Sequence, residues 1–319
     1  MKHKALIGFD INEYPEIEIF QKYFECDFCE YSEDYFYKNI SKYSILVPHL
    51  YLKLTNELIN KASNLKYIFT PSTGTNHIDL KAIDNNDINF YCLSDSAEFI
   101  SEISSTAELA WLLILASNRK ILHLNKRVLT ENSWKNNDLR GNQLKNKTIG
   151  IIGFGRLGKM IFKYAKSFDM NILIYDTDKS STNGYENYAK DFDALLKESD
   201  IITLHPKLNE TSYEMINSET LKHMKDGVII INTSRGDVIN SNDLLDSIKS
   251  GKVKFAALDV LRNEFHSGKL PNDPLIEYAL KEDNSDKILI TPHAGGATLD
   301  AHSIVFKHVA KTLKDKLYE

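Results

Sequence analysis

The chain has 319 residues, a length that favours two domains. Its formal net charge of −5 offers no basic surface for nucleic acid. Hydrophobic residues make up 42% and charged residues 26%, so disordered, collagenous and coiled-coil classes are excluded. Three cysteines are too few for a secreted disulfide framework, and the apolar run 109–116 is shorter than the about 20 residues a membrane helix needs. We expect a cytoplasmic protein without nucleic-acid or membrane partners.

Short apolar runs alternate with longer amphipathic stretches in the first part of the chain, a pattern typical of parallel α/β proteins. A predicted helix at 55–63 begins at Thr55, whose hydroxyl suits an N-cap. A longer buried helix is predicted at 104–115, with Ser104 or Ser105 as its cap and Glu108 in its first turn. The strands predicted in this part are 4–9, 44–47, 67–70 and 88–92.

A second α/β series follows the long helix. Six short strands with helices between them predict a doubly wound parallel sheet. Residues 297–316 predict a last helix that returns to pack on the first part. We therefore expect an α/β fold with two domains, one made of 1–104 and 295–319 and the other of 105–294. The strands predicted in the second series are 148–152, 172–175, 200–204, 228–232, 255–258 and 288–291.

A glycine-rich turn opens the second series. Gly153, Gly155 and Gly158 follow an apolar strand in the pattern G-x-G-x-x-G and precede a helix, the context of a dinucleotide-binding turn. The first glycine permits the tight turn, the second lets a pyrophosphate approach, and the third lets helix and strand pack closely. Backbone amides at the helix start, which includes Arg156 and Leu157, would face the phosphates.

The next strand ends at Asp176, 23 residues after Gly153 (176 − 153), close to the about 20 expected for an acid that binds the ribose hydroxyls. Such a carboxylate repels a 2′-phosphate, so the sequence favours NAD over NADP, although Lys179 nearby could sit beside such a phosphate. The alternative, a tight strand–helix turn without a ligand, is weakened because strand, glycines, helix and acid occur together.

Three ionisable residues follow three predicted strands of the second series: Arg235, Glu264 and His293. The carboxyl ends of strands in an open α/β sheet line the ligand crevice. Histidine can exchange a proton with a hydroxyl or carbonyl oxygen near neutral pH, a glutamate can fix its tautomer, and a guanidinium binds a carboxylate. Each could also be an ordinary turn residue, but together they predict acid–base chemistry on a 2-hydroxy or 2-keto acid.

At this point the chain resembles the D-isomer-specific 2-hydroxyacid dehydrogenases, most strongly from 67 to 300. The likeness includes STGTNHIDL, TAELAWLLILASNR, KTIGIIGFGRLGK, INTSRGDVI, AALDVLRNE and TPHAGG in the family's order. The resemblance implies a Rossmann-type sheet inserted into a flavodoxin-like substrate domain, NAD as cofactor and a homodimer. Stretches like 94–104 occur in a phosphoglycerate-dehydrogenase-like subgroup.

The resemblance also implies roles for individual residues. The catalytic set falls on Arg235, Glu264 and His293. Backbone amides near Thr73 and Gly74 would hold the substrate carboxylate from the other domain, together with Arg235. The residues implied to line the cofactor site, besides the glycine turn and Asp176, are His205, Thr233 and Asp259.

The chain departs from the family in ways that leave two alternatives open. Phe265 stands where the family often has proline. The arginine that phosphoglycerate-specific members often carry after the strand at 44–47 is missing, which weakens 3-phosphoglycerate dehydrogenase; a basic pocket near His49, His77 and Lys53 would revive it. The second alternative is a non-catalytic NAD(H)-sensing module, which would need only the cofactor site.

Other patterns do not predict chemistry. Cys26 and Cys29 have redox-like spacing, but no second pair or helix start supports a redox or zinc site. His302 and His308 are six residues apart on the last predicted helix, a poor spacing for a shared metal. We therefore expect no metal.

Overall fold

The computed structural model describes residues 3–318 except 30–31, 136–139, 265–268 and 282–286. The chain forms two compact units. The first contains Met1–Ile103 and Ala297–Glu319, and the second contains Ser104–Glu264 and Leu270–Gly296.

The first unit is built on a five-stranded parallel sheet in the order β2-β1-β3-β4-β5, the flavodoxin-like order. The order reverses between β1 and β3, where open sheets of this kind bind ligands at their carboxyl edge. Gly8, directly after β1, donates its amide to Val47 in β3 at 2.8 Å. The strands are β1 (Lys4–Ile7), β2 (Glu25–Phe28), β3 (Ile45–Val47), β4 (Tyr67–Thr70) and β5 (Asn89–Cys92).

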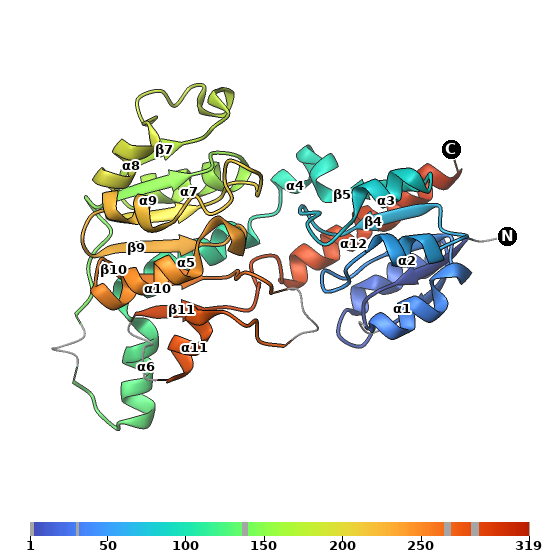
Figure 1. Ribbon diagram of the computed structural model, residues 1–319, viewed down its shortest axis with the longest axis horizontal. Helices are drawn as coiled ribbons and strands as arrows, with labels where there is room; N and C mark the ends of the chain where they lie inside the picture. The colour runs from blue at the N-terminus through green and yellow to red at the C-terminus, as the bar shows by residue number, and fades with distance from the viewer. Residues whose placement is uncertain (1–2, 30–31, 136–139, 265–268, 282–286, 319) are drawn as a thin grey trace. The chain divides into compact units, whose positions relative to one another are not determined.

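Helices cover both faces of this sheet (Figure 1). One face packs on α1 (Glu33–Asn39), α2 (Asn56–Lys61) and α3 (Leu80–Asn85). The other packs on η1 (Pro15–Lys22) and α12 (Leu299–Tyr318), whose Phe306 is buried against the sheet. The last helix therefore returns to the first unit, as predicted. The remaining short helices of this unit are η2 (Ile40–Lys42), η3 (Leu93–Asp95) and α4 (Ala97–Ser101).

The second unit is built on a six-stranded parallel sheet in the order β11-β10-β9-β8-β6-β7, a doubly wound arrangement whose order reverses between β6 and β8. β8 and β9 are buried along their whole length, as expected for parallel strands covered on both faces. The strands are β6 (Thr148–Ile152), β7 (Asn171–Tyr175), β8 (Ile201–Leu204), β9 (Val228–Asn232), β10 (Val253–Leu258) and β11 (Ile288–Ile290).

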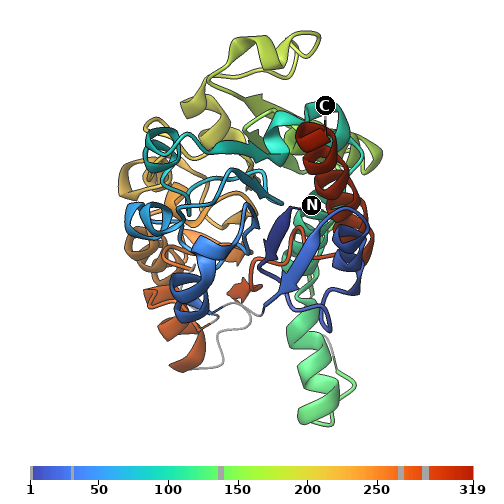
Figure 2. The same ribbon diagram turned by 90° about the vertical axis from the view of Figure 1, so that its right-hand side faces the viewer.

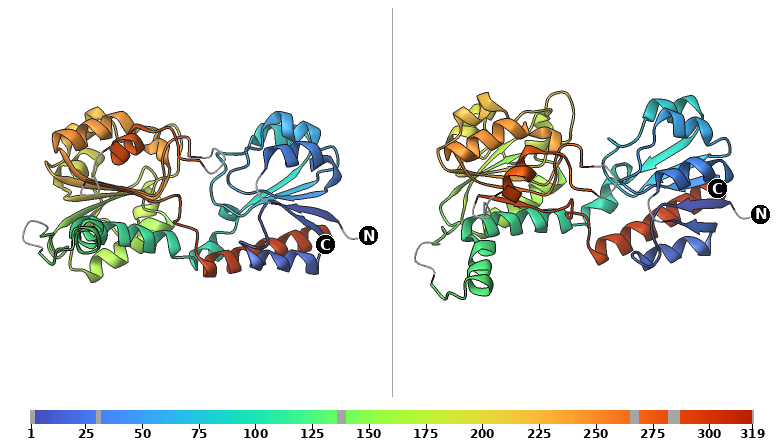
Figure 3. Two further views of the ribbon diagram at one scale, coloured as in Figure 1. Left: turned by 90° about the horizontal axis from the view of Figure 1, so that it is seen from below. Right: turned by 60° about the horizontal axis from the view of Figure 1, so that its bottom comes forward.

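Two groups of helices enclose this sheet, as the views in Figure 3 show. α5 (Ser105–Arg119) and α7 (Arg156–Ser167) pack on one face. The other face is covered by α8 (Phe192–Glu198), α9 (Ser218–His223), α10 (Ser241–Ser250) and α11 (Pro274–Lys281). The short helices η4 (Lys179–Thr182) and η5 (Gly236–Val238) complete the unit with α6 (Ile121–Thr130).

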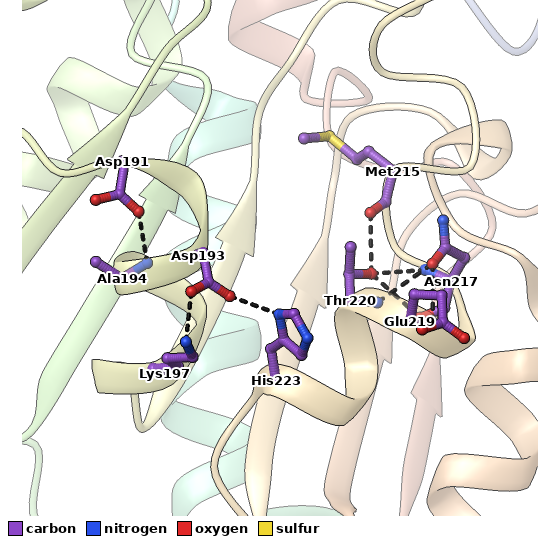
Figure 4. Close-up of polar contacts among 9 residues, drawn as sticks. All are labelled: Asp191, Asp193, Ala194, Lys197, Met215, Asn217, Glu219, Thr220 and His223. Atoms are coloured by element: carbon purple, nitrogen blue, oxygen red, sulfur yellow. Dashed lines mark hydrogen bonds and ion pairs between the residues drawn. The ribbon is translucent and has the colours of Figure 1, made fainter.

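α8 and α9 begin at side-chain caps, and Asp193 Oδ1 lies 2.5 Å from His223 Nδ1 between them (Figure 4). Asp191 accepts from the amide of Ala194 at 2.8 Å. Asn217 accepts from Thr220 at 3.2 Å, and the Thr220 hydroxyl accepts from the Asn217 amide at 2.9 Å. These reciprocal bonds satisfy amides that the first turn of a helix leaves without partners.

Most predicted elements are present, but three details of the prediction were wrong. β2 was not predicted, and neither was α6, which begins after Lys120 breaks the helix at φ 52°. Ser104 precedes α5, but its hydroxyl donates to the Glu108 carboxylate at 2.5 Å instead of capping an amide. By length and composition alone Ala97–Arg119 could cross a membrane; in the fold it forms α4 and α5, and α5 contributes to the second unit's core.

Candidate active site

The glycine turn after β6 has the geometry that its sequence predicted. Gly153 has φ +87°, and a Cβ there would lie 2.5 Å from the carbonyl carbon of His205. A Cβ at Gly158 would lie 2.2 Å from the Gly153 oxygen, whereas Gly155 faces open space. The first and third glycines are therefore required by packing, and the second leaves the backbone open to a ligand.

The helix α7 begins at Arg156, directly after Gly155 at the N-cap. A glycine offers no side chain to cap the helix, so no N-cap side chain competes with an anion for the first-turn amides, such as that of Leu157. Burial lowers the pKa of the Arg156 guanidinium, but an arginine stays charged in proteins. The turn therefore presents positive partial charges to a phosphate.

Asp176 lies directly after β7 and contacts the glycine turn. Its Oδ2 accepts from the amide of Phe154 at 2.6 Å, and its Oδ1 accepts from the amide of Asp178 at 2.9 Å. Each carboxylate oxygen keeps a further lone pair, so Asp176 can still accept from ribose hydroxyls. Lys179 stays close, donating to the Asp176 carbonyl at 3.3 Å with its ammonium 5.1 Å from the Tyr175 ring centroid.

Two buried polar atoms at the carboxyl edge of the second sheet are placed to hydrogen-bond a bound dinucleotide. Within the described parts of the chain, the Thr233 hydroxyl and Nδ1 of His205 are buried without a hydrogen-bond partner, which is uncommon in native proteins. Nε2 of His205 lies 2.8 Å from the Thr203 hydroxyl, and burial lowers the pKa of His205 to about 4. Both residues follow strands at the carboxyl edge, where a bound cofactor could satisfy them.

The three predicted catalytic residues follow three adjacent strands. Arg235 comes after β9, Glu264 after β10 and His293 after β11, and these strands are neighbours in the sheet. The carboxyl edge therefore brings together residues that are far apart in the sequence.

Glu264 and His293 form a hydrogen-bonded pair. Glu264 Oε1 lies 2.8 Å from His293 Nδ1, and Glu264 Oε2 accepts from the amide of Leu261 at 3.0 Å. An ionised carboxylate can only accept, so the proton of this bond belongs to Nδ1, and proton exchange with a substrate would use Nε2.

Asp259 holds the turn that carries His293. Its Oδ1 accepts from the Thr291 hydroxyl at 2.6 Å and from the Ala294 amide at 2.8 Å, while its Oδ2 accepts from the Gly295 amide at 2.8 Å. The side chain is buried, and burial raises its pKa. His293 adopts a left-handed backbone with φ 52°, a conformation that costs a non-glycine residue energy and occurs often at active sites. Asp259 therefore fixes this strained turn.

Arg235 lies on the same side of the sheet as the pair. Its Nη1 donates to the Ser234 carbonyl at 2.6 Å, and its own carbonyl accepts from the Asn232 side chain at 2.9 Å. Burial lowers the pKa of the guanidinium, and the negative charge of Glu264 opposes that effect. A permanently charged guanidinium in such a place can bind a carboxylate in a bidentate way.

Thr73 and Gly74 belong to the first unit, whereas the catalytic residues belong to the second. They follow β4, and the Gly74 carbonyl accepts from the Ser72 hydroxyl at 2.8 Å. Thr73 is exposed. His77 in the same loop is buried, with Nε2 3.5 Å from the Thr70 hydroxyl.

Of the residues that would make a basic pocket, His49 does not carry the positive charge that the pocket needs. Burial lowers the pKa of His49 to about 4, and His302 contributes to the effect, so His49 is neutral near pH 7. Its ring packs between Phe9, at 4.8 Å, and Tyr51, at 4.6 Å, measured between centroids. Lys53 is exposed.

The remaining sulfur and imidazole groups are not arranged as metal ligands. Cys29 is a free thiol whose pKa burial raises to about 12, which makes it unreactive. Among the residues that the structure describes, no three His, Cys, Asp or Glu side chains gather as a metal site. Phe265, which replaces the family's proline, lies outside the described residues.

Arg262, two residues before Glu264, is a residue near the site to which the sequence analysis assigned no role. Its guanidinium reaches Glu214 at 2.5 Å and Asp237 at 3.4 Å. Nothing in the sequence signals these contacts, because the partners lie 48 and 25 residues earlier in the chain.

Comparison with known proteins gives a consistent picture. The model of the family "D-isomer specific 2-hydroxyacid dehydrogenase, NAD binding domain" matches residues 111–295. A hydroxypyruvate reductase of Thermotoga maritima is 35% identical over 287 residues, which cover 90% of this chain and 88% of that protein. A D-3-phosphoglycerate dehydrogenase of Archaeoglobus fulgidus is 34% identical, but the match spans 86% of this chain and 50% of that protein.

Solved structures agree with these relatives. The structure of D-lactate dehydrogenase from Aquifex aeolicus, complexed with NAD and lactic acid, is 28% identical in sequence. It matches 98% of this chain and 95% of its own, with a TM-score of 0.81.

Proposed function

Since the chain belongs to the D-isomer-specific 2-hydroxyacid dehydrogenases, NAD-dependent enzymes that act on CH–OH donors, we propose that Arg235, Glu264 and His293 are its catalytic residues. The observation that carries the proposal is the 2.8 Å contact between Glu264 and His293. These residues follow the neighbouring strands β10 and β11, and Arg235 follows β9 on the other side of β10. The reaction transfers a hydride between the nicotinamide and C2 of a 2-hydroxy or 2-keto acid.

The three residues divide the work by their chemistry. Bound NADH would supply the hydride that adds to C2 of a 2-keto acid. The His293 imidazolium gives its Nε2 proton to the carbonyl oxygen, and in the oxidation direction the neutral imidazole takes that proton back. Glu264 keeps the proton on Nδ1 and stabilises the imidazolium. Arg235 binds the carboxylate of the substrate and polarises the adjacent carbonyl.

The cofactor site is proposed to comprise the glycine turn with Arg156 and Leu157, Asp176, His205, Thr233 and Asp259. The α7 amides would bind the pyrophosphate, and Asp176 would accept hydrogen bonds from the ribose. Two buried polar atoms that require partners, on His205 and Thr233, support this assignment. In the same proposal residues 105–294 form the cofactor domain, and 1–104 with 295–319 form the substrate domain.

We propose a small substrate without a phosphate group. A phosphorylated 2-keto acid needs a cationic partner for its phosphate, and His49 is neutral near pH 7 because of its burial. The backbone amides near Thr73 and Gly74, a loop open on the surface of the first unit, would bind the carboxylate. The 3-phosphoglycerate alternative is therefore not favoured.

The alternative of a non-catalytic NAD(H)-sensing module is disfavoured by the Glu264–His293 pair, since a sensor gains nothing from a positioned imidazole. The experiment that separates the two functions is a panel of 2-keto acids assayed with NADH and NADPH. It should contain glyoxylate, pyruvate, hydroxypyruvate and phosphorylated hydroxypyruvate. Turnover of an unphosphorylated member with NADH is expected. NADH binding without turnover of any member would favour the sensor.

We also propose a cytoplasmic homodimer that contacts its partner through α6. This helix projects from the second unit in Figures 1 and 2 and in the right-hand view of Figure 3. Its Leu129 is 73% exposed, and Trp134 beyond it is 90% exposed, an apolar surface unusual for a monomer. Light scattering after gel filtration should give a dimer mass, and Leu129→Glu should lower it toward the monomer.

A further inference from the structure

The segment that carries Glu264 has no regular structure of its own. β10 ends at Leu258, and residues 259–264 form neither helix nor strand. Asn263, next to Glu264, has φ 57°, a left-handed conformation that asparagine tolerates better than most residues. Because misplacing a reacting group by about 1 Å can cost 10²-fold in rate, something must hold this segment in place.

Arg262 makes the contacts that can hold it. Its Nη1 donates to Glu214 Oε1 at 2.5 Å, and its Nη2 donates to the Tyr213 hydroxyl at 2.5 Å. Its Nε lies 3.4 Å from Asp237 Oδ1, and the guanidinium carbon lies 5.4 Å from the Tyr213 ring centroid. The planar fork of one guanidinium thus reaches three side chains on two other segments.

One of those two segments carries Arg235, and the other is bonded to it. Asp237 lies two residues after Arg235, and its carbonyl accepts from the Glu214 amide at 2.8 Å. Gly236, between Arg235 and Asp237, packs against the backbone of Leu261 directly before Arg262. A Cβ at Gly236 would lie 2.0 Å from the Leu261 carbonyl carbon. Arg262 therefore closes a junction between the segment of Arg235 and the segment of Glu264.

An isolated surface ion pair contributes little to stability, so the ordinary expectation is that Arg262 has no role in catalysis. The geometry here differs, because the side chain is 26% exposed and makes several contacts with fixed orientation, which only a guanidinium can make. We propose that Arg262 is a positioning residue that fixes the Glu264 carboxylate against His293 and relative to Arg235. The proposal rests on the catalytic roles proposed above.

The first test compares Arg262→Met and Arg262→Lys with wild type. Arg262→Met is expected to lower kcat for the best 2-keto acid by about 10- to 100-fold and to leave the KM for NADH within about twofold. Arg262→Lys should recover only part of the loss, because an ammonium cannot reproduce the fork. The matched control is Lys252→Met, which breaks a 2.9 Å ion pair with Asp226 at the amino end of β10 and should leave kcat unchanged.

A double-mutant cycle decides whether Arg262 acts through Glu264. In a Glu264→Gln background, Arg262→Met should lower kcat by less than about twofold further. The same fold loss in both backgrounds, or unchanged kcat in Arg262→Met, would overturn the proposal. Asp237→Asn, which weakens one contact, should give a smaller loss of the same kind and replaces Arg262→Met if that variant fails to fold.

A readout without turnover separates this proposal from the catalytic assignment. A proton shared between imidazole Nδ1 and a carboxylate gives a far-downfield proton NMR signal, assigned here by its loss in His293→Gln. The signal should persist in Lys252→Met and shift or broaden in Arg262→Met. An unaltered signal in Arg262→Met would contradict the positioning role even if no substrate were known, whereas absence of turnover in wild type would contradict the proposed function alone.

Discussion

Asp259 and Glu264, two carboxylates on the segment after β10, bind different parts of the His293 turn. Asp259 accepts from one hydroxyl and two amides of the His293 turn, whereas Glu264 accepts from the imidazole itself. The sequence predicted the type and strand-end position of Glu264 and His293, because hydride transfer to a carbonyl needs a proton donor there. It could not predict the three contacts of Asp259 or the contacts of Arg262, because their partners become neighbours only in the folded chain.

The carboxylate of Asp176 is predicted to bind the ribose of the cofactor. Asp176→Ala should raise the KM for NADH by about 10- to 100-fold, since hydrogen bonds to a charged group contribute about 1.5–3 kcal/mol each. It should also narrow the preference for NADH over NADPH, because Lys179, which lies beside Asp176, can then approach a 2′-phosphate. Steady-state kinetics with both cofactors measure the effect.

The control for this prediction is Asp178→Ala. Asp178 is two residues away and accepts from the Ser180 amide at 2.9 Å, a local bond that does not involve the glycine turn. This variant should keep its KM for NADH within about twofold. An Asp176→Ala enzyme with the KM values of wild type would show that the carboxylate does not bind ribose.

At the scale of helices and strands, buried periodic segments were predictable and exposed ones were not. β6 and β9 have the predicted bounds, because an apolar run covered on both faces has few alternative structures. β2 was missed because its sequence, ECDF, is partly exposed and carries two acids. α6 was missed because its apolar residues do not face a core of this chain: no residue of it is buried.

The caps of the short helices allow a prediction about stability. Asn217→Ala removes the cap of α9 (Figure 4) and should lower the free energy of unfolding by about 1 kcal/mol. Urea denaturation followed by circular dichroism measures the change. Asn242→Ala is the control, since Asn242 is exposed in the first turn of α10 and should change the unfolding free energy by less than about 0.5 kcal/mol. Equal effects of the two variants would argue against the cap.

For the whole molecule, partly buried histidines connect folding with pH. Burial lowers the pKa values of His49 and His205 to about 4, and it also lowers those of His302 and His308. His49 and His302 lie in the first unit and His205 in the second. Both units therefore contain imidazoles whose neutral form is favoured in the folded chain.

The sign of the pH dependence follows from these shifts. Below about pH 6.5 the unfolded chain binds more protons than the folded chain, so the free energy of unfolding falls as the pH falls toward 4. Each of His49 and His205 can contribute up to about 1.4 kcal/mol per pH unit in this window. Denaturation at several pH values should give a flatter profile for His205→Gln than for wild type. An identical slope would contradict the neutral assignment.

The two sheets and their strand orders agree with the family's fold, yet the cofactor and carboxylate contacts stay predictions because they involve molecules other than the chain itself. What the chain alone establishes is the imidazole–carboxylate pair at the edge of the second sheet. The proposed function depends on whether that pair performs the proton transfer.

The decisive measurement is kcat of His293→Gln for reduction of the preferred 2-keto acid, made together with the Kd for NADH. General acid–base catalysis contributes about 10²- to 10⁴-fold to a rate, so kcat should fall by that factor while the Kd stays within about twofold. His223→Gln, which changes an exposed histidine of the same unit that is bonded to Asp193, should keep wild-type kcat. A His293→Gln enzyme that retains kcat within about twofold of wild type would contradict the account.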